Sequence, residues 1–191
     1  MPRVTVPTRS RLLWRSICHW RGPIRPPFAL RDWLTHPGSL TARLIDKSQG
    51  RFDVQVLRQV IGRPSPDERA ALGIRNSDLA LIREVILRGN NQDWVFARSL
   101  LPLSSLTGAL RHLRKQTNRP LGAFLFSQPH LVRSPLQVAR IGREQACVPA
   151  SLMDDDFLWG RRSVFSLRGK PLLVSEVFLP DFVASLYPEQ A

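Results

Sequence analysis

Residues 158–180 read LWGRRSVFSLRGKPLLVSEVFLP, and this stretch decides the fold. Two apolar runs flank the turn-forming residues GKP at 169–171, so the stretch predicts a β-hairpin with strands at 161–168 and 172–179. The second strand reads as buried on both faces, yet it carries one carboxylate, Glu176. A buried carboxylate is costly unless it is paired or used in chemistry. Glu176 is therefore the first candidate for a functional side chain.

Two arginines occupy comparable positions on other apolar strands. Because side chains alternate along a strand, Arg83 lies between apolar neighbours on its own face of strand 79–88, and Arg98 does so on strand 93–101. An arginine keeps its charge, so a buried one must find an anion. Two interpretations stay open. Either Glu176 forms a core ion pair with Arg83 or Arg98, or these side chains surround an anionic ligand whose hydroxyl group or proton Glu176 handles.

Two further segments carry weaker signals of an anion site. The sequence RPLGAFLF at 119–126 begins an apolar helix whose first backbone N–H groups can face an anion, although a plain turn fits equally well. The pair Arg161-Arg162 at a strand start has the pattern of an exposed basic pair, with an anion contact as the alternative.

The rest of the chain predicts strands that are joined mainly as hairpins, with helices between them. The expected strands are 52–61, 79–88, 93–101, 132–143, 161–168 and 172–179, and the expected helices are 29–36, 39–47, 66–72, 104–116 and 120–126. This order predicts an α+β fold with a single antiparallel β-sheet of about six strands and helices packed on one face. The clearest helix signal is SPDE at 65–68, a capping box with proline at the first helical position, which Gly73 ends.

Nearly half of the excess charge lies at the N-terminus. The chain of 191 residues has a formal net charge of +13, and residues 1–26 hold six arginines and no acidic residue. We therefore divide the chain into a basic, flexible tail at 1–26 and one folded domain at 27–191. The domain shows no basic stripe interleaved with aromatic residues, so nucleic acid is not an expected partner. The tail itself could solubilise the chain, touch nucleic acid or anionic lipid weakly, or act as a transit peptide.

Several function classes are disfavoured by the composition. No apolar run approaches the roughly 18–20 residues that span a bilayer, and the N-terminus has no unbroken apolar signal region, so we expect no stable membrane insertion. Cys18 and Cys147 are far apart and follow no metal or redox spacing, which predicts reduced thiols in the cytoplasm. The four histidines are equally scattered, so no metal site is expected.

Three segments taken together resemble a known family: LIREVILRGNNQDWVFARSLLPLSSL at 81–106, RPLGAFLF at 119–126, and the opening stretch 158–180. In order and spacing they are similar to bacterial chorismate–pyruvate lyase, with a weaker match at 32–44. The resemblance implies a sheet with helical flaps over a buried ligand and no cofactor. It also implies an enzyme that makes 4-hydroxybenzoate and pyruvate from chorismate, the first committed step toward ubiquinone. We expect the protein to be a monomer.

The resemblance also implies site residues. Arg83 corresponds to the arginine that holds the ring carboxylate, and Glu176 to the glutamate that meets the ring hydroxyl, which makes it the candidate catalytic residue. Leu121 lies at the leucine whose backbone lines the site, and Leu40 falls where the family often has methionine in a flap. Arg98 matches a further arginine near the pocket, a contact for the enolpyruvyl carboxylate.

This chain departs from the family pattern in its longer basic tail, in Leu40, and in an apparent insertion at 145–157. Two other functions compete with a lyase. Effector domains of some transcription regulators share this fold and bind ligands without converting them, but such proteins carry an upstream DNA-binding domain of about 60–70 residues, where this chain has only the 26-residue tail. A basic nucleic-acid-binding protein would show steep salt dependence.

Overall fold

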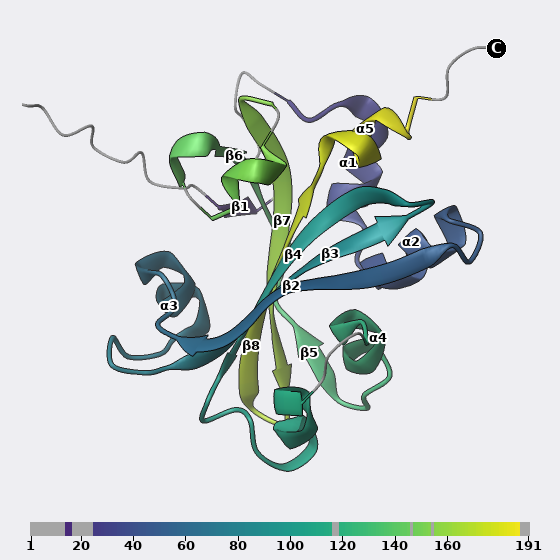
Figure 1. The fold of residues 1–191 in the computed structure, drawn as a ribbon. Coiled ribbons are helices and arrows are strands. Elements are labelled where there is room, and N and C mark those ends of the chain that lie inside the picture. The colour runs from purple at the N-terminus through teal and green to yellow at the C-terminus, as the bar shows by residue number, and fades with distance from the viewer. Residues whose placement is uncertain (1–13, 17–24, 116–118, 146, 154, 188–191) are drawn as a thin grey trace, which may run out of the picture.

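The computed structural model describes residues 14–16, 25–115, 119–145, 147–153 and 155–187 (Figure 1). Within these ranges the chain forms one antiparallel sheet of eight strands, with five α-helices and three 3₁₀ segments around it. The predicted α+β class and single antiparallel sheet are confirmed, although the strands number eight rather than about six. None of the described helices is long and apolar enough to cross a membrane.

The elements have the following bounds. The strands are β1 (Arg15–Ser16), β2 (Phe52–Gly62), β3 (Ala80–Gly89), β4 (Gln92–Pro102), β5 (Leu131–Arg133), β6 (Gln137–Gly142), β7 (Phe157–Leu167) and β8 (Lys170–Phe178). The helices are α1 (Phe28–Thr35), α2 (Leu40–Lys47), α3 (Pro66–Leu72), α4 (Leu121–Phe126) and α5 (Pro180–Ala184). The 3₁₀ segments are η2 (Gly108–Lys115), η3 (Arg143–Gln145) and η4 (Ala150–Leu152).

Two hairpins, β3–β4 and β7–β8, form the centre of the sheet. The strand order is β1-β6-β7-β8-β4-β3-β2, and β5 pairs with the far end of β7. The hairpins join where β4 pairs with β8, which places Glu176 beside Ala97 on one side and Arg161 on the other. Both predicted hairpins are therefore present, and Glu176 lies on a central strand.

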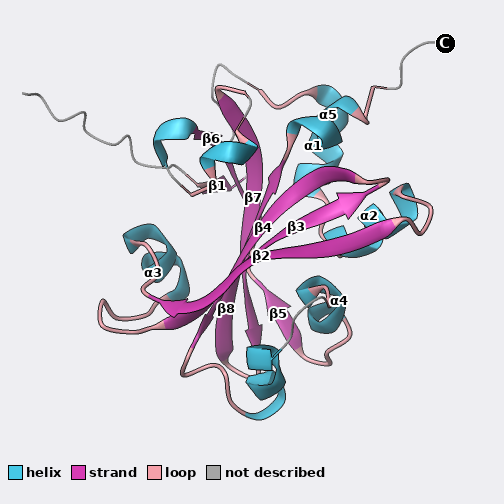
Figure 2. Cartoon of the chain, in the orientation of Figure 1, coloured by secondary structure: helices cyan, strands magenta, loops and turns pink. Residues whose placement is uncertain are grey.

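Both faces of the sheet are apolar, and helices cover both (Figure 2). We call the face that carries Arg83 and Glu176 the cavity face; α1, α2 and α4 cover it. On the opposite face, Leu72 of α3 packs with Ile82 and Leu173. Figure 1 shows α3 on one side of the strands and α2 and α4 on the other. The sequence placed helices on one face only, and this detail is corrected because each apolar face needs cover.

Two other predicted elements differ in the structure. The expected strand 132–143 is divided into β5 and β6, because Pro135 has no N–H to continue a ladder. The expected helix 104–116 is instead the 3₁₀ segment η2, which begins at Gly108 with a φ of +56°. Ser105 caps no helix, and its hydroxyl donates to the Pro171 carbonyl at 2.8 Å.

The predicted tail at 1–26 lies mostly outside the described residues. Of its described part, Arg15 and Ser16 form β1, which pairs with Val138 and Gln137 at the edge of the sheet. The division into a tail and a domain at residue 27 stays a prediction.

The capping box of α3 yields a stability prediction. The Ser65 hydroxyl accepts from the Glu68 amide at 3.3 Å, and the Glu68 carboxylate accepts from the Ser65 amide at 2.7 Å. We expect Ser65→Ala to lower the free energy of unfolding by about 1 kcal/mol, because one helix N–H loses its acceptor. Urea unfolding followed by circular dichroism measures it. Ser104→Ala, at an exposed turn position, serves as the control; equal midpoints for the two variants would refute the prediction.

Candidate active site

A buried ion pair joins the two strands of the β7–β8 hairpin. Arg161 and Glu176 face each other in the register of these strands, and Arg161 Nε donates to Glu176 Oε2 at 2.7 Å. The Arg161 side chain is 1% exposed and that of Glu176 is 15% exposed. In such a dry setting the loss of either charge would leave the other uncompensated. The pair therefore fixes the position of the Glu176 carboxylate.

The partner of Glu176 differs from the sequence expectation. The sequence favoured Arg83 or Arg98, and it favoured an exposed basic pair at Arg161. The predicted ion pair of Glu176 with Arg83 or Arg98 and the predicted exposure of Arg161 are both wrong, because Arg161 is buried and holds Glu176. The register of the hairpin could have predicted this partner. If Leu167 pairs with Lys170 at the turn, Arg161 lies directly opposite Glu176.

Arg161 also holds the segment between α1 and α2. Its Nη1 donates to the Trp33 carbonyl at 2.8 Å and to the His36 carbonyl at 3.0 Å. These carbonyls lie in the last turn of α1 and just beyond it, where a helix end carries partial negative charge. One side chain thus connects the sheet, the Glu176 carboxylate and the covering helices.

A small cavity lies between the cavity face and the helices that cover it. Its volume is about 30 Å³, room for about two water molecules. It brings together four of the five residues that the sequence assigned to a site: Arg83 and Glu176 from the sheet, Leu40 from α2 and Leu121 from α4. Leu40, Arg83 and Leu121 are each less than one-tenth exposed. A ring-sized ligand can enter only if the covering helices move, so we call α2 and α4 the flaps.

The two flaps touch each other above the cavity. A Cβ atom built on Gly122 of α4 would lie 2.8 Å from Thr41 Oγ1 of α2. Real Cβ atoms do not approach other atoms so closely, so Gly122 is the residue that lets the flaps close this far.

Besides Arg161, the cavity wall contains Arg83 and Arg133. Arg83 Nη2 donates to the Arg119 carbonyl at 3.4 Å, and burial lowers the pKa of Arg83. Arg133 of β5 donates from Nε to Ser163 Oγ at 3.0 Å. Burial, with the nearby charge of Arg161, lowers the pKa of Arg133 to about 10. Both arginines remain cations at neutral pH, so the cavity suits an anion.

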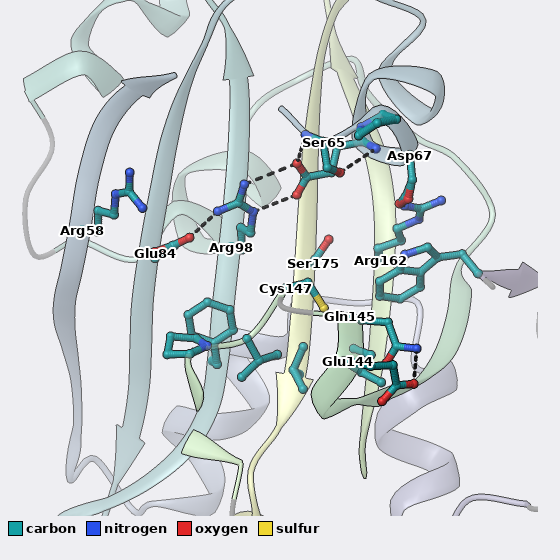
Figure 3. A pocket seen from close by; sticks show the side chains of 18 residues that line it. Arg58, Ser65, Asp67, Glu84, Arg98, Glu144, Gln145, Cys147, Arg162 and Ser175 are labelled. Atoms are coloured by element: carbon teal, nitrogen blue, oxygen red, sulfur yellow. Dashed lines mark hydrogen bonds and ion pairs between the residues drawn. The ribbon is translucent and has the colours of Figure 1, made fainter. Parts of the chain in front are cut away.

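Arg98 does not reach this cavity, contrary to the sequence expectation. It pairs in register with Glu84, whereas Arg83 pairs with Ser99, so the two arginines point to opposite faces of the sheet. Arg98 Nε donates to Glu68 Oε1 at 2.7 Å, and Arg98 Nη1 donates to Glu84 Oε1 (Figure 3). Burial alone would lower the pKa of Arg98, but Glu68 and Glu84 outweigh it and raise that pKa. Arg98 therefore belongs to a buried ionic network.

A larger hollow of about 710 Å³ lies on the opposite face, beside this network (Figure 3). Besides Arg98, it is lined by Arg162, whose Nη1 donates to Asp67 Oδ2 at 2.5 Å. Its one thiol, Cys147, has a pKa that burial raises to about 11, so the reactive thiolate is scarce at neutral pH. Arg98 and Arg162 already have carboxylate partners, so the candidate active site is the smaller cavity with the fixed carboxylate. In the part of the chain that the structure describes, no three His, Cys, Asp or Glu side chains gather as metal ligands.

The match to a family agrees with this site. The family model described as chorismate lyase matches residues 11–188. The chain belongs to the chorismate lyase family. It is 46% identical over 169 residues to the probable chorismate pyruvate-lyase of Aromatoleum aromaticum, which covers 84% of this chain and 91% of that protein. The relative from Azoarcus sp., with the same name, is 47% identical and covers 82% and 88%. The resemblance seen in the sequence is confirmed, and the protein is a lyase.

Solved structures with low sequence identity share the fold of this lyase. The effector domain of PhnF from Mycobacterium smegmatis matches with a TM-score of 0.51 and 19% identity, covering 75% of this chain and 90% of that domain. Such a likeness concerns the fold alone.

The position of Arg98 in this ionic network yields a prediction about stability. Arg98→Met leaves Glu68 and Glu84 without their cation, and these side chains are only 10% and 13% exposed. We expect a loss of about 3–5 kcal/mol in the free energy of unfolding, measured in urea. The matched control is Arg88→Met on the same hairpin, whose ion pair with Asp93 is 33% and 38% exposed. This control should lose at most about 1 kcal/mol, and similar losses in the two variants would rule out the assigned role of Arg98.

Proposed function

We propose that this protein is a chorismate–pyruvate lyase, which converts chorismate into 4-hydroxybenzoate and pyruvate. The structural observation that carries the proposal is Glu176, a carboxylate held by Arg161 at the wall of a closed cationic cavity. The family match and the names of the relatives support the substrate.

The proposed roles of the binding residues follow from their chemistry. Arg83 holds the ring carboxylate, since its planar guanidinium can form two parallel hydrogen bonds with a carboxylate. Leu121 contributes backbone beside that carboxylate, and Leu40 closes the apolar side of the ring from the flap. A closed cavity that excludes bulk water strengthens each of these polar contacts.

Glu176 acts at C4 of the ring. One of its oxygens, Oε2, accepts from Arg161, while Oε1 accepts no hydrogen bond from the residues that the structure describes. Oε1 is therefore available to a ligand, where it accepts from the 4-hydroxyl and can take the C4 proton. Arg161 holds the Glu176 carboxylate in place at the ring through this hydrogen bond, which makes Arg161 a positioning residue.

The reaction depends mainly on how the substrate is aligned in the cavity, because formation of the aromatic ring drives it. The C3–O bond breaks, and its electron pair leaves with the ether oxygen of enolpyruvate, which takes up a proton to become pyruvate. The C4–H electron pair moves into the ring as the proton goes to a base, and the ring becomes aromatic. The protein supplies alignment of the ether, exclusion of water and the base.

The product gives the reaction its place in metabolism. We propose that 4-hydroxybenzoate from this lyase enters ubiquinone synthesis as its first committed intermediate. The cytoplasmic location and monomeric state that the sequence suggested stay predictions.

A sensor that binds an aromatic carboxylate without converting it was the alternative. The PhnF effector domain shares the fold at 19% identity, whereas relatives named as lyases share 38–47% over most of the chain. The lyase is therefore the better proposal.

The activity can be tested directly. Purified protein with chorismate should release 4-hydroxybenzoate, followed by chromatography, and pyruvate in equal amount. Product no faster than the spontaneous background would contradict the proposal.

We expect Glu176→Gln to lower kcat by about 100-fold or more, because the amide cannot take the C4 proton. Near-normal kcat in this variant would exclude Glu176 as the base and leave it an orienting role.

Arg83 can be tested by binding. We expect Arg83→Ala to weaken 4-hydroxybenzoate binding by about tenfold or more, because the ring carboxylate loses a charged partner. Titration calorimetry measures the affinity, and thermal unfolding reports whether the variant still folds. If Arg83→Ala unfolds at 25 °C, the residue has a structural role; a folded variant that binds like the wild type would remove Arg83 from the site.

A further inference from the structure

No carboxylate of the described residues forms an ion pair with Arg133, which lines the cavity. Arg161 is paired with Glu176. The hydrogen bonds of Arg133 go to uncharged acceptors: Ser163 Oγ, the Pro37 carbonyl at 2.5 Å and the Gly38 carbonyl at 3.5 Å. Arg133 is half-buried, and a partly desolvated cation gains from a direct anionic partner. Glu176 acts on it only from a distance, without a hydrogen bond or ion pair between them.

The charge of the cavity as a whole matches a dianion. Its lining contains four ionisable side chains, Arg83, Arg133, Arg161 and Glu176, with a net charge of +2. Chorismate carries two carboxylates, one on the ring and one on the enolpyruvyl group. Arg83 is already assigned to the ring carboxylate, and Arg161 is used by Glu176. The second carboxylate therefore needs the remaining cation.

The geometry of Arg133 suits that role. Its Nε and Nη1 are occupied, but Nη2 donates to none of the residues that the structure describes. The guanidinium carbon lies 5.1 Å from the centre of the Phe165 ring and 5.9 Å from that of Phe126. These rings limit the tilt of the guanidinium plane, so the N–H groups of Nη2 keep a fixed direction at the cavity wall.

We propose that Arg133 is the binding residue for the enolpyruvyl carboxylate of the substrate, a subsite that distinguishes the dianionic substrate from its monoanionic aromatic product. The inference rests on the proposed lyase function. Because Arg133 also holds the Pro37 and Gly38 carbonyls next to flap α2, the second carboxylate engages a residue that already ties the flap to the sheet. When pyruvate leaves, Arg133 loses its anion, while the contacts of the ring carboxylate to Arg83 remain.

The test compares substrate and product in one variant. We expect Arg133→Gln to raise KM for chorismate by about tenfold or more. The Kd for 4-hydroxybenzoate should change less than about threefold, because this product has no second carboxylate. Arg133→Lys should fall between the wild type and Arg133→Gln for chorismate, since it keeps the charge but loses the fork. Steady-state kinetics and titration calorimetry give these values.

The control is Arg140→Gln, because Arg140 is also stacked on a phenylalanine, at 3.8 Å from the Phe157 ring centre, but is exposed and outside the cavity. It should leave both constants unchanged. Equal weakening of chorismate and 4-hydroxybenzoate in Arg133→Gln would overturn the inference in favour of a simple flap clamp, and so would an unchanged KM. If Arg133→Gln does not fold, Arg133→Lys decides, since wild-type KM there would equally overturn the proposed fork. A wild-type protein that does not convert chorismate would instead refute the proposed function itself.

Discussion

The hydrogen-bonded ion pair between Arg161 and Glu176 is the interaction on which the rest of the structure depends. It crosses the central β7–β8 hairpin, so the two strands must keep one register for both charges to remain compensated. The same guanidinium donates to two carbonyls at the end of α1, which positions the covering helices. Sheet register, flap position and the direction of the candidate catalytic carboxylate are therefore one constraint.

The alternation of side chains along a strand explains why two arginines with similar sequence neighbours have different roles. Arg83 and Arg98 both lie between apolar neighbours, but Arg83 opposes Ser99 and Arg98 opposes Glu84, so the sheet separates them. On the cavity face the arginines face a space with one carboxylate; on the opposite face, Glu68 and Glu84 neutralise Arg98 within the protein. Arg98 is neutralised within the protein and contributes to the structure, whereas the excess positive charge of the cavity is available to a ligand.

Much of this arrangement could be predicted from the sequence, and the remainder has a physical explanation. Local signals fixed both hairpins and the capping box at Ser65, because turns and caps depend on neighbouring residues. Alternation found Glu176 and Arg83. It could not show which strands become neighbours, so Arg161 was not among the arginines considered as partners of Glu176, and Arg98 was expected at the pocket. The carbonyl contacts of Arg133 and Arg161 have no sequence signature, since every residue carries a carbonyl.

That last feature has an evolutionary consequence. Arg161 donates to the main-chain carbonyls of Trp33 and His36, and the side chains of these two residues take no part in the hydrogen bonds. Mutational drift at these two positions leaves the acceptors in place, provided that the helix still ends at the same residue. A lineage can therefore vary the covering helices to admit other ligands while the attachment to the sheet is inherited unchanged.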